Sequence, residues 1–278
     1  MKTMTKNLLA TTALGVGLLL AGPAMAGAVA SGFDTTQFPA NDDGYLGPLA
    51  LGFSANYFGT TYTSTFLSNN GYLTFGSGQG TYTPSGLGSG YSGLPIIAPF
   101  FADVDTRGAG SGLTSYGTGT YAGHTAWGAT WPAVGYYGAQ TDKLNTFQVI
   151  LTDRSDTGVG NFDIYFNYDS IQWETGNASG GTDGLGGISA AAGYNAGSGN
   201  AAGTYYQIPG SLVNGALIDG GPDALNTGTN DGTPGQFLFE VRNGAVILPP
   251  SGVPEPASLA VLGIGLAALG AVRRRNKG

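Results

Sequence analysis

The chain has 278 residues and a formal net charge of −7, with 51 glycines, one histidine and no cysteine. A net negative charge repels nucleic acid, so nucleic-acid binding is excluded as an expected function. The missing cysteines exclude disulfides and thiol chemistry, and the single histidine leaves no ordinary ligand set for zinc.

The first 26 residues have the pattern of a secretory signal peptide. Lys2 and Lys6 precede an apolar run over residues 8–20, and Ala24-Met25-Ala26 supplies small residues at the usual cleavage positions. We therefore predict a signal helix within residues 1–26, cleavage before Gly27, and export of the rest of the chain.

Between the two apolar ends the sequence predicts β structure. In residues 145–152 and 161–168 every second residue is apolar, which is the spacing of a strand that buries one face. The polar, glycine-containing stretch 153–160 between them predicts an antiparallel hairpin. The inward residues would be Phe147, Val149 and Leu151 in the first strand and Phe162, Ile164, Phe166 and Tyr168 in the second.

The other strand candidates are short and are separated by glycine-rich loops. Together they predict an all-β fold, an antiparallel two-sheet sandwich that forms one domain over residues 27–244, followed by an extended linker over residues 245–252. The candidates are Tyr57 to Leu67, Gly71 to Phe75, Ile96 to Phe101, Thr114 to Tyr116, Ala126 to Trp131, Gly187 to Tyr194 and Phe237 to Arg242, the last of which would close the sheet.

A series of residue clusters runs through the predicted domain. They are Ile97 to Gly108, Ala126 to Trp131, Val134 to Tyr137, Asn145 to Leu151, Phe162 to Gly176, Ala192 to Tyr194, Pro209 to Ser211 and Pro234 to Phe239. In order and residue type they resemble the NIDO domain, an extracellular module first described in the basement-membrane protein nidogen. The resemblance covers nearly the whole mature chain, and it implies an adhesive protein without established catalysis.

The aromatic residues of these clusters have two interpretations. Trp127 and Trp131 are four residues apart, so they share one face of a strand, and a core position is favoured over a sugar-stacking surface. Tyr136 and Tyr137 are adjacent, so an extended backbone would expose at least one of them. Both are therefore candidate ligand contacts.

Asp103 and Asp105 are candidate Ca²⁺ ligands, because residues i and i+2 of an extended segment point to the same side and Ca²⁺ prefers oxygen ligands. Arg107 stands where an EF-hand loop would have another oxygen ligand, which argues against that motif. In the alternative interpretation, Asp105 pairs with Arg107 or caps backbone N–H groups in a turn. Weaker acidic pairs are Asp42 with Asp43 and Asp153 with Asp156. No cofactor other than Ca²⁺ is suggested.

Catalysis has little support in the sequence. His124 lies in a glycine-rich stretch and is not accompanied by the nucleophile-elbow pattern of a serine hydrolase. Asp169 and Glu174 could form the carboxylate pair of a glycosidase, but both are expected in a turn that follows a strand, where carboxylates are usually solvated. We predict that the protein is not an enzyme.

The last 26 residues combine three elements. Val253-Pro254-Glu255-Pro256 is extended and cannot enter a helix, residues 257–272 form an uncharged apolar run, and Arg273, Arg274 and Arg275 follow. At about 1.5 Å per residue the run covers most of a bilayer core, so it predicts a single transmembrane helix with the arginines as its cytoplasmic anchor. The combination resembles the PEP-CTERM sorting signal of Gram-negative bacteria.

The second resemblance implies that an exosortase-like membrane enzyme recognises Val253 to Pro256 and removes the helix during export. The protein would be anchored transiently in the inner membrane and would then reach the cell surface or the extracellular space. Six of the 10 basic residues but only one of the 17 acidic residues lie in the two ends, so the mature domain has a formal charge of 4 − 16 = −12.

These features predict an exported adhesion or structural protein of the cell surface or extracellular matrix, associated with exopolysaccharide or another envelope component of a biofilm. The alternative is a Ca²⁺-dependent lectin or a carbohydrate-active protein. Affinity for polysaccharide that disappears with a chelator would favour the lectin, and sugar release would favour the carbohydrate-active protein.

Overall fold

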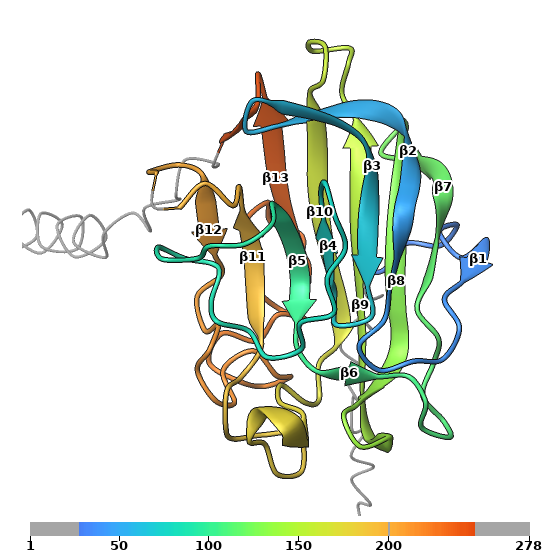
Figure 1. Cartoon of the computed structure of the whole chain (residues 1–278), viewed down its shortest axis with the longest axis vertical. Coiled ribbons are helices and arrows are strands. Elements are labelled where there is room, and N and C mark those ends of the chain that lie inside the picture. The colour runs from blue at the N-terminus through green and yellow to red at the C-terminus, as the bar shows by residue number, and fades with distance from the viewer. Residues whose placement is uncertain (1–27, 200, 248–278) are drawn as a thin grey trace, which may run out of the picture.

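The computed structural model describes residues 28–199 and 201–247, which form a sandwich of two antiparallel β-sheets (Figure 1). One 3₁₀ turn, η1 (Asn177–Ser179), is the only helical element in these residues. The strands are β1 (Thr36–Gln37), β2 (Tyr45–Tyr57), β3 (Thr60–Ser68), β4 (Tyr72–Thr74), β5 (Ile96–Phe101), β6 (Val104–Asp105), β7 (Ser115–Tyr121), β8 (His124–Tyr136), β9 (Gln140–Asp153), β10 (Phe162–Ser170), β11 (Ala191–Asn195), β12 (Tyr205–Gln207), β13 (Gln236–Arg242) and β14 (Ala245–Ile247).

The two sheets have different sizes. The larger has the strand order β1-β7-β8-β9-β10-β13-β14, with β6 added beside β8, and the smaller has the order β12-β11-β5-β4-β3-β2. The chain crosses between the sheets at several points, including the short connection from β5 to β6. The predicted all-β two-sheet sandwich is therefore confirmed for the part of the chain that the structure describes.

The predicted hairpin is confirmed as β9 and β10, which pair antiparallel with Ile164 opposite Leu151 and Phe166 opposite Val149. All seven predicted inward side chains are buried in the core between the sheets. The expectation that only one face is buried was wrong. The segment before β1 lies across the outer face, where Phe33 packs with Ile150 and Tyr165, because Gly128 leaves room for the Phe33 ring.

The prediction of one continuous strand from Tyr57 to Leu67 was also wrong. The chain reverses at Phe58 and Gly59, whose φ angles are 50° and 90°, and positive values at both positions are typical of two-residue hairpin turns. Tyr57 therefore pairs with Thr60, and the residues before the turn form the long strand β2.

The tryptophans lie in the core, as their spacing indicated. Trp127 and Trp131 on β8 are 1% and 0% exposed, and Trp173 is also fully buried. The indole N–H of Trp131 donates to the carbonyl of Asn69 at 2.8 Å, and that of Trp173 donates to Val134 at 3.1 Å. Each ring therefore ties the sheet interior to a connecting segment.

The C-terminal boundary of the domain differs from the prediction. Ala245–Ile247 form β14 and pair with β13, so these residues belong to the sheet and not to a linker. β13 consequently lies one strand in from the edge and does not close the sheet. The predicted signal helix (1–26) and the sorting tail with its transmembrane helix (253–278) lie outside the described residues. Among the residues that are described, no helix is long and apolar enough to cross a bilayer.

Candidate functional site

The corner that joins β5 to β6 holds the acidic residues singled out in the sequence. Here Ala102 and Asp103 pass from the smaller sheet to the larger one (Figure 1). Backbone and side-chain oxygens of Asn70 accept hydrogen bonds from Ala102 N at 3.2 Å and Val104 N at 2.9 Å. The carbonyl of Asp103 accepts the N–H of Tyr137 at 3.0 Å. These bonds fix the backbone, and therefore the direction of the Asp103 side chain.

Asp105 is committed to an ion pair and a turn. Its Oδ2 lies 2.7 Å from the Arg107 guanidinium and accepts the N–H of Ala139 at 2.8 Å, while Oδ1 accepts the Arg107 backbone N–H at 2.9 Å. Burial alone would raise the pKa of this carboxyl, but the hydrogen bonds from Arg107 and Ala139 hold it below the ordinary 3.8. Asp105 therefore has the contacts of the alternative interpretation, an ion pair with Arg107 and hydrogen bonds from backbone N–H groups.

Asp103 has a very different environment. Its side chain is 1% exposed, and neither carboxylate oxygen has a hydrogen-bond partner among the described residues. The carboxylate lies against the backbone of Gly176, where an added Cβ would come within 2.4 Å of Asp103 Oδ2. Only glycine therefore fits beside this carboxylate.

Two further carboxylates from a distant part of the chain face Asp103. Asp42 and Asp43 belong to the loop before β2, and single oxygens of the three acids all lie within 4.8 Å of one another. Asp42 Oδ2 accepts from Arg107 at 2.8 Å, whereas its Oδ1 is buried without a partner among the described residues. Asp43 Oδ1 accepts from the Asn70 amide at 2.9 Å. We call these three residues the acidic cluster.

The loop that carries Asp42 and Asp43 is held firmly against the corner. The Asn69 side-chain amide donates to the carbonyls of Asp42 at 2.7 Å and Val104 at 2.7 Å, which bridges the two segments. Thr106 N–H donates to the carbonyl of Asn41 at 3.0 Å. The acidic cluster is therefore preorganised by neutral hydrogen bonds.

Burial and mutual repulsion make the acidic cluster costly in its charged form. Burial, followed by the charges of Asp42, Asp43 and Asp105, raises the pKa of Asp103 from 3.8 to about 7, and Arg107 opposes this only in part. Burial and neighbouring Asp105 likewise raise the pKa of Asp42 to about 6. A raised folded-state pKa means that the unfolded state loses these protons first. The penalty on the folded state therefore begins near pH 4 and is complete above about pH 7.

The two tyrosines proposed as ligand contacts are placed differently. Tyr136 is 2% exposed, with its ring against Trp173 and its hydroxyl donating to Asp142 at 2.8 Å. Because its ring lies in the core, it has no face to offer to a ligand. Tyr137 directly follows it and is 36% exposed, so of the two it is the one accessible to a ligand, and its backbone N–H donates to Asp103.

The residues considered for catalysis are dispersed. His124 Nδ1 lies 3.9 Å from Asp156, whose carboxylate is also held by Arg154 at 3.1 Å. Asp153 accepts from Ser155 in the same turn. Asp169 is exposed, as expected for a solvated carboxylate, but it lies within β10 at a register shift and not in a turn. Glu174 differs from the expectation, because it is fully buried.

Glu174 acts as a connection between loops. Its two oxygens accept the backbone N–H groups of Gly215 and Leu217, each at 2.6 Å. Burial raises the pKa of this carboxyl, although the two backbone hydrogen bonds oppose the shift. Both oxygens are occupied by the protein's own backbone, which is the position of a structural carboxylate.

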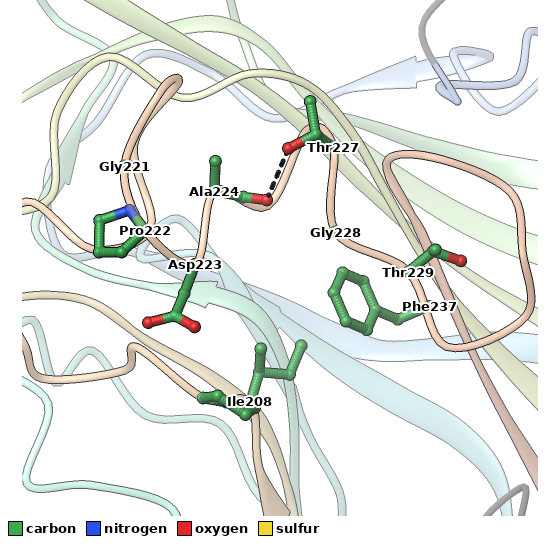
Figure 2. Close-up of a pocket in the computed structure, with 10 residues that line it drawn as sticks. Ile208, Gly221, Pro222, Asp223, Ala224, Thr227, Gly228, Thr229 and Phe237 are labelled. Carbon is green, nitrogen blue, oxygen red and sulfur yellow. Dashed lines mark hydrogen bonds between the residues drawn. The ribbon is translucent and has the colours of Figure 1, made fainter. Parts of the chain in front are cut away.

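A pocket of about 290 Å³ lies among the loops that follow β12 and precede β13. Figure 2 shows Phe237 beside Thr229 and apart from Asp223, with Ile208 below and a hydrogen bond from Thr227 to the carbonyl of Ala224. Asp223 is the one carboxylate in the described lining, whereas glycoside hydrolysis requires two. The pocket offers an apolar recess with polar edges, and no assembled catalytic group.

The sequence pointed to each acid of the cluster but not to the cluster itself. In the sequence, Asp42 and Asp43 form one acidic pair, and the i, i+2 spacing relates Asp103 to Asp105. Neighbours in a strand can be inferred from spacing, but contact between residues 60 positions apart depends on how two loops meet. The acidic Asp-Asp pair beside Gly44 was the available signal for a turn rich in carboxylates.

Comparison with known proteins identifies two matching families. Residues 63–243 match the nidogen-like domain model, and residues 252–275 match the PEP-CTERM protein-sorting motif. No solved structure matches the chain.

Three curated relatives illustrate the similarity. The chain is 31% identical to alpha-tectorin of Gallus gallus over 253 residues, which cover 82% of this chain and 11% of that protein. Alpha-tectorin of Homo sapiens is 32% identical over 241 residues, 78% of this chain and 10% of that protein. Nidogen of Drosophila melanogaster is 30% identical over 208 residues, 67% of this chain and 14% of that protein. The chain thus spans between a tenth and a seventh of the length of these relatives.

Proposed function

The chain belongs to the nidogen-like domain family, and on this basis we propose that it is an exported adhesion or structural protein of the cell surface or extracellular matrix. The observation that carries the proposal is that this domain and a PEP-CTERM protein-sorting motif occur on one chain. The sorting motif supports an exosortase-like membrane enzyme as a processing partner. The role is non-enzymatic, in keeping with the dispersed carboxylates and the buried, occupied Glu174.

The sorting step has a direct genetic test. Replacing Pro254, Glu255 and Pro256 together with alanine is expected to leave an unprocessed precursor in the inner-membrane fraction, because alanines no longer hold the recognition segment extended before the apolar run. Immunoblots of membrane, surface and medium fractions measure the outcome. A matched variant with Pro249 and Pro250 replaced, outside the motif's four residues, should be processed normally. Mature-sized protein from the triple variant would contradict the proposed recognition.

We further propose that the partner is exopolysaccharide or another hydrated component of the envelope. The domain carries few charges and many polar, glycine-rich loops, which suits weak contacts repeated over a matrix. Its exposed aromatic side chains are tyrosines, among which Tyr45, Tyr82 and Tyr137 are 50%, 37% and 36% exposed. Tyrosine combines an apolar ring with a hydrogen-bonding hydroxyl, as sugar contact requires.

Binding to matrix polysaccharide tests this partner. The full chain is expected to bind exopolysaccharide isolated from the producing cells, and Tyr137→Ala should weaken binding about 3- to 10-fold, because it removes one aromatic contact. Sedimentation with the insoluble polysaccharide measures the bound fraction. Val159→Ala, which shortens an apolar side chain that is 93% exposed at the β9–β10 hairpin, is the matched control and should bind normally.

The same assay decides the competing function. Tyr137 lies next to the acidic cluster through its hydrogen bond to Asp103, which favours Ca²⁺-dependent saccharide binding as a second candidate. Loss of binding in chelator would favour that lectin function, and release of soluble sugar would favour a carbohydrate-active protein. A wild-type chain that binds no envelope fraction would contradict matrix adhesion.

A further inference from the structure

We propose that the carboxylates of Asp42, Asp43 and Asp103 bind one Ca²⁺ ion between the loop before β2 and the corner that joins β5 to β6. The three acids each present an oxygen within 4.8 Å of the others. All the donors are oxygen, without nitrogen or sulfur, so the cluster suits a hard cation and not zinc or copper. The proposed ligands differ from those predicted from the sequence, because Asp42 and Asp43 replace Asp105 as the partners of Asp103. The proposal does not depend on the proposed adhesive function.

The unpartnered oxygens are the second and independent observation. Both oxygens of Asp103 and one oxygen of Asp42 are buried, and none has a hydrogen-bond partner among the described residues. Buried polar atoms are almost always paired, and an unpaired carboxylate carries a particularly high desolvation cost. A cation held by one oxygen of each acid would place a positive charge beside these buried, unpaired atoms.

The neighbouring positive charge is already in use. Arg107 binds Asp42 Oδ2 and Asp105 Oδ2, at 2.8 and 2.7 Å. Four carboxylates, those of Asp42, Asp43, Asp103 and Asp105, therefore share one guanidinium, and with all four ionised the local charge is −4 + 1 = −3. A divalent cation would reduce this charge to about −1, which removes most of the mutual repulsion.

The geometry favours Ca²⁺ over Mg²⁺. Ca²⁺ accepts six to eight oxygens in irregular arrangements, whereas Mg²⁺ requires a near-octahedral set and holds its water tightly. Asp43 is exposed, so water can complete the coordination from that side. An exported protein meets Ca²⁺ at concentrations that suit weak extracellular sites, whose Kd is about 0.1 to 1 mM.

An ion at this position would have a structural consequence. The loop before β2 and the corner after β5 are about 60 residues apart in the chain, and the corner is a crossing point between the two sheets. The ion would join the two segments where their carboxylates otherwise repel each other. Ca²⁺ binding should therefore stabilise the fold, because the unfolded chain does not bring the three acids together.

Calorimetric titration and thermal unfolding of the full chain with Ca²⁺ alone test the site. We expect one ion bound per chain, and a Tm that rises by about 5 to 10 °C at Ca²⁺ concentrations near 100 times Kd. Asp103→Asn should abolish this shift. In chelator the same variant should be at least as stable as the wild type, because it removes a buried charge that has no hydrogen-bond partner among the described residues. Undiminished stability without Ca²⁺ would distinguish a lost ion site from a damaged fold.

Two further variants keep the test decisive. Asp43→Asn changes an exposed side chain that can still accept from Asn70, so it should fold normally and weaken Ca²⁺ binding at least about tenfold through the lost charge. Asp153→Asn, at the last residue of β9 and outside the acidic cluster, should leave binding unchanged. A wild-type chain that binds no Ca²⁺ at several times the expected Kd would mean that Asp103 is neutralised by a proton alone, and would overturn the proposal. Equal binding by wild type and Asp103→Asn would overturn it as well.

Discussion

Replacing Trp131 with alanine is expected to lower the free energy of unfolding by about 3 to 5 kcal/mol. The side chain is fully buried, and its ring is stacked on Phe147 with centroids 4.9 Å apart and an interplanar angle of 14°. Alanine would leave a large cavity and would also remove the N–H donor that satisfies the carbonyl of Asn69. Urea denaturation followed by fluorescence, with Trp127 and Trp173 as remaining reporters, measures the loss.

The comparison with an exposed aromatic residue separates the core position from a sugar-binding surface. Tyr137→Ala should change the free energy of unfolding by no more than about 0.5 kcal/mol, since the side chain is partly solvated and its backbone hydrogen bond to Asp103 is retained. Trp131→Phe should be intermediate, because the ring remains while the hydrogen bond is lost. If Trp131→Ala were as stable as the wild type, the core position would be contradicted and the sugar-stacking interpretation favoured.

Such core positions could be predicted because strands have a simple period. The alternating apolar residues of β9, β10 and β13 identified the buried face of the larger sheet, and the four-residue spacing of Trp127 and Trp131 placed both rings inward. Ile96–Phe101 was predicted with the bounds that the structure shows. The buried positions and the strand bounds follow from the spacing of apolar residues along the chain, so they can be predicted without knowledge of tertiary contacts.

Features that depend on irregular backbone could not be predicted in the same way. The long strand β2 contains Gly47, Pro48 and Gly52, and its pairing with β3 shifts register twice, so it has no steady alternation. The sequence also gave no sign that the outer face of the larger sheet would be covered, because Phe33 reaches it only through the space left by Gly128. The acidic cluster is a similar case, since its members come from two loops that meet only in the folded chain.

Glu174 was expected to be solvated but is fully buried. Its replacement should have the second large effect on the stability of the fold. Glu174→Ala is expected to lower the free energy of unfolding by about 2 to 4 kcal/mol, because two backbone N–H groups lose charge-assisted hydrogen bonds and one of them is buried. Relief of the desolvation cost of the carboxylate offsets part of the loss. Chemical denaturation measures the total, and hydrogen exchange should show faster exchange at Gly215 and Leu217.

Two matched variants distinguish this structural role from a catalytic one. Glu174→Gln keeps one acceptor oxygen but places an amide N–H₂ against the other backbone N–H, so it should lose roughly half as much stability as Glu174→Ala. Asp169→Ala, which removes an exposed carboxylate near the end of β10, should be close to neutral. If Glu174→Gln were as stable as the wild type, with normal exchange at Gly215 and Leu217, the loop connection would be refuted. The buried carboxylate would then require a different explanation, of which glycoside cleavage is the one to assay.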